Sequence, residues 1–368
     1  MKQKKLVYYF LILSISLTLL LPILNLSFSN NYKKINLQSF SKQQLFSTDI
    51  IESIKNYFVY KTFNISLNES KVIAGNDNFF FLGNGFGRII DKVKGNFPYT
   101  NKDIDAWTTK LNKLQNWYKK QGIQFIFVVA SNKHTVYSDK LPNSIRYKEE
   151  GTITNDLAKS SLDKNIHILD LKKALRKKAQ EKQLYFRTDT HWNHYGALIG
   201  YINTMQYLNT IYMKSYKIPE YTMIETTTSA GGDLTNFLKI NHFLASNHEK
   251  DYNLTFKRQS KECYGKITES SKLEKCTPGI KNTFNQYSIH ESSSNKEKLL
   301  YVCDSFGLAN SQLYEKTFNT VWRLHIQYIE HINGDLLASF IQKHKPDVVI
   351  YQIVERDLNN YHYNAPHK

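Results

Sequence analysis

Two short stretches, far apart in the chain, hold side chains that could perform nucleophilic chemistry. The first, residues 186–194, places Asp189 and His191 two positions apart. In an extended segment such residues point to the same side, so the carboxylate can orient the imidazole as an acid orients a base. The second is the apolar run 299–303, which leads into Ser305 in a small polar turn. Together, Asp189, His191 and Ser305 predict an acid–base–nucleophile triad.

Each half of this pattern also has a simpler explanation. The Trp-containing segment could be a packed corner in which Asp189 caps the following helix, and Ser305 alone could be a helix cap. Asp189, His191 and His194 could instead bind a metal ion. That arrangement needs His194 on the same side as His191, although the helix is expected to have begun there. We therefore expect a triad, with no metal and no cofactor.

The surrounding elements alternate between helix and strand, which indicates an α/β domain with a mainly parallel sheet. The continuous apolar run 123–130 is typical of a parallel strand buried on both faces, and Asp103 is expected to cap the helix before it. The expected helices are 103–120, 154–163, a basic helix to about 183, 194–213, 307–317 and 335–344, and the expected strands are 123–130, 166–171, 299–304, 320–326 and 347–354.

The position of Ser305 at the end of a strand favours a functional site. In open α/β sheets, sites form beyond the carboxyl ends of the strands. A helix starting after Ser305 would aim backbone N–H groups at an oxyanion beside the hydroxyl. The loop that carries Asp189 and His191 can reach the same edge of the sheet.

The N-terminus predicts export. Residues 6–24 form a charge-free apolar run, close to the length of about 20 residues that a bilayer span needs. Lys2, Lys4 and Lys5 precede it, and positive flanks stay on the cytoplasmic side. No small-residue cleavage site follows, so we favour an uncleaved signal anchor over a cleaved signal peptide. The expected organisation is a cytoplasmic tail over 1–5, an anchor over 6–28, a stalk over 29–70 with local helix near 48–60, and a catalytic domain over 71–360 with an irregular insertion at 215–297.

The formal net charge is +17, which favours an anionic partner such as nucleic acid, lipid headgroups or an acidic polysaccharide. A Lys-rich solvated surface would give the same charge, and export argues against nucleic acid. Cys263 and Cys276 share a polar segment and could form a disulfide outside the cytoplasm. Cys303 lies in an apolar strand and is expected to be buried.

The sequence resembles the SGNH-hydrolase-like polysaccharide O-acetyltransferases of alginate biosynthesis, the AlgJ/AlgX family. The resemblance covers about 72–358 and rests on Asp-Thr-His-Trp-Asn-x-x-Gly-Ala at 189–197 and on Asp304-Ser305-Phe306. Supporting segments are 75–82, 133–142, 232–234 and 354–358. The resemblance implies an SGNH-hydrolase-like (flavodoxin-like) fold in which the Asp-His pair precedes the serine. It also implies that Ser305 is the nucleophile, His191 the base and Asp189 the orienting acid. The family's usual glycine before Asp-Ser is Cys303 here.

The function that the resemblance implies is a membrane-anchored, exported O-acetyltransferase. It would acetylate an extracellular or cell-envelope polysaccharide through acetyl-Ser305, with acetyl groups supplied by a membrane O-acyltransferase partner. The protein would be a single-pass protein of a bacterial inner membrane, with the catalytic domain in the periplasm. A carbohydrate esterase with the same triad is an alternative, because transferase and esterase differ only in the acceptor. A catalytically silent polysaccharide-binding or assembly protein is a second alternative.

A tetrahedral oxyanion usually receives at least two donors, of which the Ser305 N–H could be one. We expect Arg323, in the strand after the Ser305 helix, or Lys133, after the first core strand, to supply another. Lys133 could also meet an acidic sugar. Asn132 and Tyr137, in the same loop as Lys133, complete the expected substrate-binding or oxyanion residues. For Arg323 and Lys133 the alternative is a structural ion pair or a snorkelling side chain.

Overall fold

The structure is a computed structural model that describes residues 2–32, 45–229, 231–244, 248–257, 262–268, 270–278, 285–331 and 334–358. Its centre is a seven-stranded sheet in the order β4-β3-β11-β9-β10-β8-β7. The bounds are β3 Gln124–Ala130, β4 Ile168–Asp170, β7 Glu262–Lys266, β8 Gln286–His290, β9 Lys298–Cys303, β10 Thr320–His325 and β11 Val348–Val354. All neighbours from β4 to β10 are parallel, whereas β8 and β7 are added antiparallel at one edge. The prediction of a mainly parallel α/β sheet is confirmed.

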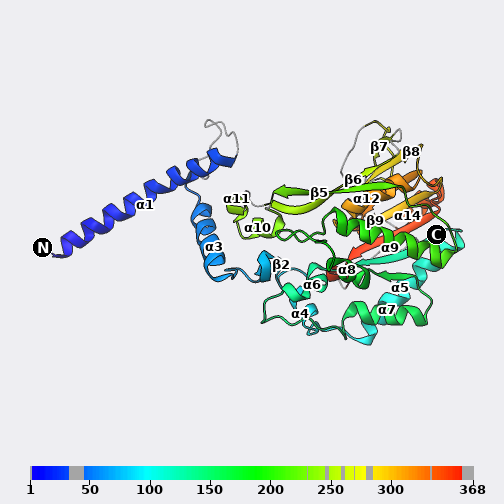
Figure 1. The fold of residues 1–368 in the computed structure, drawn as a ribbon, viewed down its shortest axis with the longest axis horizontal. Coiled ribbons are helices and arrows are strands. Elements are labelled where there is room, and N and C mark those ends of the chain that lie inside the picture. Colours follow the sequence, from blue (N-terminus) through cyan, green and yellow to red (C-terminus); the bar gives the residue numbers. More distant parts are fainter. Residues whose placement is uncertain are drawn as a thin grey trace.

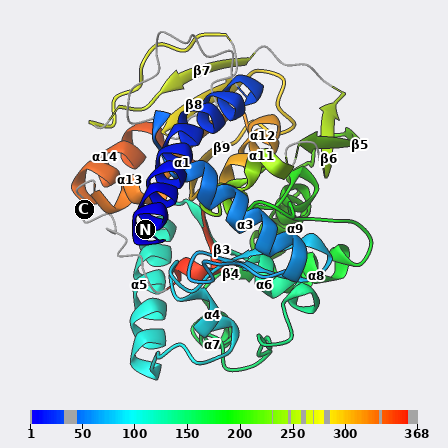
Figure 2. The same cartoon turned by 90° about the vertical axis from the view of Figure 1, so that its left-hand side faces the viewer.

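Alternate residues of the central strands enter two apolar cores, one on each face of the sheet. In β11, Ile350 packs into one core and Tyr351 into the other, as the two-residue repeat of a strand requires. One face is covered by α8 (Lys172–Ala179), α9 (His194–Tyr212) and α12 (Gly307–Thr317). The other is covered by α5 (Asn101–Lys120), α7 (Ile153–Asp163), α13 (Ile326–His331) and α14 (Gly334–His344). Figure 2 shows α8 and α9 on one side of the strands and α13 and α14 on the other.

Three expected boundaries differ from the structure. The cap of α5 is Thr100, and Asp103 is the third helical residue of a capping box in which its carboxylate accepts from the Thr100 N–H. The strand expected at 166–171 is only β4, and the basic helix ends at Ala179 rather than near 183. Beyond that helix the chain turns toward a bridge between Tyr185 and Trp192, which an extended backbone can make and a helix cannot.

The prediction of an irregular insertion over 215–297 is wrong for its described parts. They contain the antiparallel pair β5 (Tyr221–Ser229) and β6 (His248–Phe256), the short helices α10 (Asp233–Phe237) and α11 (Asn241–Leu244), and the edge strands β7 and β8. Many side chains of β5 and β6 are solvent-exposed, so these strands lack the apolar runs by which buried strands are recognised. The predicted Cys263–Cys276 disulfide is confirmed, as is the burial of Cys303.

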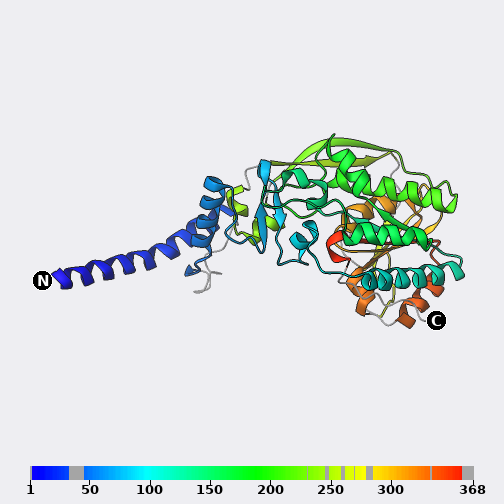
Figure 3. The same ribbon diagram turned by 90° about the horizontal axis from the view of Figure 1, so that it is seen from below.

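The described residues 2–32 and 45–63 of the N-terminal part contain two helices outside the main sheet. Within α1 (Lys2–Tyr32), residues Lys4–Ser27 are long and apolar enough to cross a membrane. Figures 1 and 3 show α1 projecting from the domain, with α3 (Asp49–Phe63) between α1 and the rest of the chain. Residues 33–44 of the expected stalk lie outside the described residues.

The second of these helices, α3, lies where the sequence predicted local helix near 48–60, and it packs against the domain. The Ser53 hydroxyl donates to the Lys239 carbonyl, and Asn56 Nδ2 donates to the Leu238 carbonyl over 2.8 Å. Short elements then lead into the sheet: the antiparallel pair β1 (Val72–Ala74) and β2 (Phe80–Leu82), α4 (Ile89–Val93) and, after β3, α6 (Lys133–Val136).

Candidate active site

Ser305, His191 and Asp189 form a continuous hydrogen-bonded chain. His191 Nε2 lies 2.9 Å from Ser305 Oγ, and His191 Nδ1 lies 2.7 Å from Asp189 Oδ1. Because the carboxylate accepts the Nδ1–H, the Nε2 lone pair faces the serine hydroxyl. The side chains of His191 and Asp189 are 31% and 24% exposed, so solvent-borne molecules can reach the site. The structure thus brings together the three residues that the sequence singled out.

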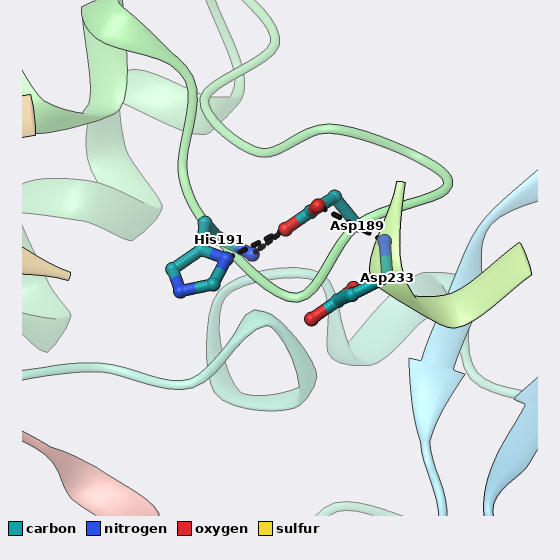
Figure 4. A group of neighbouring side chains, drawn as sticks. All are labelled: Asp189, His191 and Asp233. Carbon is teal, nitrogen blue, oxygen red and sulfur yellow. Dashed lines mark hydrogen bonds and ion pairs between the residues drawn. The ribbon is translucent and has the colours of Figure 1, made fainter. Parts of the chain in front are cut away.

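Asp189 is held as a carboxylate. Burial raises its pKa, but the hydrogen bond and charge of His191, together with backbone N–H donors, outweigh burial and hold the pKa well below its usual range. Its Oδ1 also accepts from the His191 N–H over 2.9 Å, and its Oδ2 accepts from the Asp233 N–H over 3.1 Å. Figure 4 shows the carboxylate between the imidazole of His191 and the backbone of Asp233.

The start of α10 braces the Asp189 loop. The Asp233 carboxylate accepts from the Thr190 N–H over 2.8 Å and from the Thr190 hydroxyl over 2.5 Å. A Cβ on Gly232 would lie 2.4 Å from Asp189 Cβ, so this close approach requires glycine. The sequence analysis used residues 232–234 only as a supporting motif and missed this bracing role. The motif itself was the available signal.

The metal alternative is not supported in the form considered from the sequence. His194 turns to Asp251, with Nδ1 2.9 Å from both carboxylate oxygens, and so joins a separate pair. Ligand atoms of Asp189, His191 and Asp233 do lie within 4.8 Å of one another. Protein donors already satisfy both carboxylates, however, and His191 Nδ1 serves Asp189. The cluster is therefore complete as a hydrogen-bond network.

The turn that carries Ser305 is fastened by Asp304. Asp304 Oδ1 accepts from the Phe306 N–H over 2.9 Å, and Oδ2 accepts from the Val354 N–H at the end of β11 over 2.6 Å. Burial raises the pKa of Asp304 to about 6. Cys303 before it keeps the regular register of β9 with both neighbouring strands. A Cβ on Gly307 would lie 2.3 Å from Cys303 Cβ, so the glycine of the next turn makes room for the cysteine.

Phe306 joins the two halves of the site. Its carbonyl accepts from the Trp192 indole over 3.0 Å, and its ring lies 4.9 Å from the His191 ring and 5.3 Å from the Trp192 ring. The Arg356 guanidinium lies 5.4 Å from the same ring. The packed-corner explanation of the Trp-containing segment is thus correct as far as the packing goes, because the corner holds His191 against the serine turn. Its second part is wrong, because the cap of the following helix α9 is Asn193 and not Asp189.

Fewer backbone N–H groups are available to an oxyanion than we expected from a helix that begins after Ser305. The N–H groups of Phe306, Gly307 and Leu308 donate to acceptors in Asp304 and Ser305. Among the described residues, the Ser305 N–H has no acceptor and so remains available. Asn132 is buried and lines a small cavity that also borders Thr190.

Arg323 does not fit the expected oxyanion role. Its side chain is 1% exposed. The guanidinium donates to the Ser311 hydroxyl and lies 4.0 Å from Glu315. Both partners are on α12, so the ion pair joins β10 to α12. The structural alternative considered from the sequence is the observed one.

Lys133 is also absent from the substrate side. It is 2% exposed, and its Nζ donates to the carbonyls of Phe186, Arg187 and Asp189 over 3.0, 3.1 and 2.7 Å. Burial lowers its pKa to about 8. Lys133 therefore fixes the backbone of the catalytic loop and cannot meet a sugar.

Tyr137 has a similar structural role. It is 7% exposed, and its hydroxyl accepts from the Leu184 N–H over 2.8 Å. The buried carboxylate of Glu249, which the sequence analysis did not single out, accepts from the N–H and hydroxyl of Thr188. No motif marked Glu249, because its strand lies in the segment expected to be irregular.

The parallel sheet, the serine at the end of β9 and the preceding Asp-His loop define an SGNH-hydrolase-like domain. The family model of the SGNH hydrolase-like domain of acetyltransferase AlgX matches residues 72–269, just over half of the chain. The chain therefore belongs to this family of O-acetyltransferases. The matched segment contains Asp189, His191 and Asp233, whereas Ser305 lies beyond it. A search of curated proteins by sequence finds no match.

Solved structures share the fold at low sequence identity. The O-acetyltransferase domain of Pseudomonas putida AlgJ is 16% identical, with a TM-score of 0.52, over 79% of this chain and 93% of that one. Bacillus cereus PatB1 is 17% identical, with a TM-score of 0.56, over 78% of this chain and 96% of that one. A second PatB1 structure, with a sulfonyl adduct, is 17% identical, with a TM-score of 0.55, over 79% of this chain and 95% of that one.

Replacing Lys133 by Met tests its hold on the catalytic loop. The carbonyls of Phe186 and Asp189 would lose the Lys133 donor, whereas the Arg187 carbonyl keeps the Phe80 N–H. An unsatisfied buried group costs about 1–3 kcal/mol. We expect the free energy of unfolding to fall by about 3 kcal/mol or more in urea titrations, and ester turnover to fall as the loop loosens. The control is Lys140→Met, which removes a surface ion pair with Asp77 worth no more than about 1 kcal/mol. Equal stability of the two variants would contradict this assignment.

The raised pKa of Asp304 predicts a pH dependence of stability. An unfolded Asp titrates at about 3.9, so between about pH 4 and pH 6 the folded protein binds more protons than the unfolded chain. The free energy of unfolding should therefore fall as pH rises through this window. Asp304→Asn should remove that slope, while also lowering stability at every pH because one N–H loses its acceptor. Asp163→Asn, at an exposed position, should keep the slope. Parallel pH profiles of wild type and Asp304→Asn would refute the prediction.

Proposed function

We propose that this protein is an exported, membrane-anchored O-acetyltransferase that carries the acetyl group on Ser305 before passing it to a polysaccharide hydroxyl. The observation that carries the proposal is the chain of hydrogen bonds from Ser305 Oγ through His191 to Asp189, over 2.9 and 2.7 Å. Membership of the acetyltransferase family supports the reaction class.

In the first half-reaction, His191 Nε2 takes the Ser305 proton while Oγ attacks the acetyl carbonyl of the donor ester. The Ser305 N–H is available to the oxyanion that forms. Asp189 remains ionised beside the imidazolium and stabilises its charge. Collapse of the tetrahedral intermediate breaks the donor C–O bond, and His191 returns the proton to the leaving alkoxide. The product is acetyl-Ser305.

In the second half-reaction, a sugar hydroxyl takes the place of the donor alcohol. His191 accepts its proton as the sugar oxygen attacks the acetyl carbon. Collapse then releases the acetylated sugar, and the proton returns to Ser305 Oγ. Water would give the esterase reaction by the same steps, so the choice of acceptor depends on what occupies the site and not on the triad.

The N-terminal helix supports the membrane part of the proposal. Residues Lys4–Ser27 satisfy the length and composition of a span, and the lysines before it favour a cytoplasmic N-terminus. A domain held on the outer side of an inner membrane needs an acetyl donor that has crossed the bilayer. A membrane O-acyltransferase partner would meet that need.

Ser305→Ala tests the nucleophile. We expect turnover of an activated acetyl ester to fall by about 10⁴-fold or more while the melting temperature stays close to wild type. Ser270→Ala, at an exposed serine, is the matched control. Assays with and without oligosaccharide separate transfer from hydrolysis: acetylated oligosaccharide supports the transferase, and free acetate alone supports the esterase. A sulfonyl fluoride probe should label Ser305, as the sulfonyl adduct of Bacillus cereus PatB1 suggests. Wild-type turnover by Ser305→Ala would overturn the proposal.

An open depression beside the catalytic loop offers a place for an acidic acceptor chain. It has a volume of about 580 Å³ and is lined in part by Phe79, Lys182 and Arg187 and also by Tyr137, one of the expected substrate-binding residues. The two carboxylates in its lining, Asp77 and Glu181, are paired with Lys140 and Lys178. Arg187 lies 5.6 Å from the Phe79 ring, and Lys182 Nζ lies 5.5 Å from the Tyr252 ring. Within the described part of the chain, neither cation pairs with a carboxylate. Arg187 is two residues from Asp189, so the depression borders the loop that carries the acid and the base of the triad.

Arg187→Gln should raise the apparent KM for an acidic oligosaccharide and leave hydrolysis of a small neutral ester unchanged. Added salt should reproduce the effect in wild type, because it screens the same attraction. The control is Lys217→Gln, which removes one positive charge from a different depression. If both variants and wild type show the same KM, the acceptor binds elsewhere.

A further inference from the structure

The helix α3 exposes an apolar face that the fold itself does not use. Ile51, Ile54 and Phe58 are 50%, 41% and 62% exposed, and their spacing of three and four residues places them in one stripe. We call these three residues the α3 apolar face. Phe46, shortly before the helix begins, is 50% exposed as well. Large apolar side chains gathered in this way mark an interaction site.

The opposite face of α3 is fixed to the domain through polar groups. Ser53 and Asn56 bond to the carbonyls of Lys239 and Leu238, and Tyr60 donates to Asn78 Oδ1 over 3.1 Å. A helix on a soluble domain normally turns its apolar stripe inward, whereas α3 turns Ile51, Ile54 and Phe58 away from the domain.

The α3 helix sits beside the end of the candidate membrane span. Asn25 Nδ2, near the end of the apolar part of α1, donates to the carbonyls of Leu45 and Ser47 over 2.8 and 3.0 Å. In Figures 1 and 3, α3 runs across the direction of α1 and lies between α1 and the domain. A span that crosses the bilayer would therefore leave α3 along the membrane surface, with the α3 apolar face toward the lipid.

The charged residues of α3 also fit a helix that lies along a membrane surface. Asp49 and Glu52 both pair with Lys239 over 2.6 Å. Lys55 and Lys61 are exposed and pair with no carboxylate among the described residues. Phe and Ile side chains flanked by exposed lysines are typical of a helix that lies in a membrane interface, where anionic headgroups attract the lysines.

We propose that α3 lies in the headgroup region of the same bilayer that α1 spans, with Ile51, Ile54 and Phe58 inserted among the upper acyl chains. The inference rests on the proposed membrane anchor. It has a consequence for the active site, because the Lys239 and Leu238 carbonyls that hold α3 directly follow α10, and the Asp233 N–H of α10 donates to Asp189. The membrane surface would thereby hold the catalytic loop at a fixed height and orientation.

Depth-dependent quenching on the full-length protein tests this placement. Phe58→Cys provides a labelling site, because Cys303 is buried and Cys263 and Cys276 form a disulfide. The protein is labelled with an environment-sensitive fluorophore and reconstituted in vesicles of phosphatidylethanolamine and phosphatidylglycerol. We expect strong quenching by lipids spin-labelled near the headgroup and little quenching by aqueous iodide. The control is Leu162→Cys on α7, at an 80% exposed residue, which should show the reverse pattern.

Two outcomes would overturn the inference. Equal iodide quenching at positions 58 and 162 in vesicles would place α3 in water. Protection of position 58 only after co-reconstitution with an integral membrane O-acyltransferase would assign the face to a protein partner and not to lipid.

A functional measurement separates this inference from the proposed chemistry. The double variant Ile51→Glu/Phe58→Glu should lose most acetyl transfer from a membrane-borne donor, by about 10-fold or more, yet keep wild-type turnover of a soluble acetyl ester. Leu162→Glu should change neither rate. If wild type itself fails to turn over the ester, the triad proposal fails, whereas the quenching result on α3 still stands. Unchanged membrane-dependent transfer in the double variant would contradict the role of α3 in orientation.

Discussion

The carboxylate of Asp189 is the group on which the rest of the site depends. It accepts hydrogen bonds from the Nδ1–H and the backbone N–H of His191 and from the Asp233 N–H. This set of donors keeps it ionised despite burial and fixes which imidazole nitrogen faces Ser305. The supporting residues serve the same end: Lys133 holds the backbone carbonyls of the loop, and Gly232 leaves room for the carboxylate. Removing any one of these contacts would disturb the position of the Asp189 carboxylate.

Much of this arrangement could be predicted from the sequence, because it follows from local patterns. The apolar run at 123–130 predicted a buried parallel strand, and β3 is one. The two-residue spacing of Asp189 and His191 predicted that their side chains point to the same side. The apolar strand before Ser305 predicted that the serine lies at the carboxyl end of that strand. These inferences needed only the repeat of a strand and the rule that sites form at carboxyl ends.

The parts that could not be predicted depend on contacts between distant segments. Arg323 and Lys133 were expected to contact the substrate because a charged side chain in or directly after an apolar strand needs an interaction partner. Their neighbours in the sequence do not reveal which partner that is. The partners are Glu315 on α12 and the carbonyls of the catalytic loop. The strands β5 and β6 were missed because their solvent-facing sides carry polar residues, which the search for apolar runs passes over.

The order of strands in the sheet makes the serine turn depend on a strand from the far C-terminal part of the domain. The last strand in sequence, β11, lies between β3 and β9 at the middle of the sheet, and its Val354 N–H fastens the Asp304 side chain beside the nucleophile. His191, in the loop that carries the acid and the base, precedes Ser305 by 114 residues in the sequence. Without β11, the chain would hold the acid and the base but would lack the Val354 N–H that fastens the serine turn. The position of the nucleophile therefore depends on one of the most C-terminal elements of the domain, and the pairing of β3 and β9 with β11 links the two halves of the sheet.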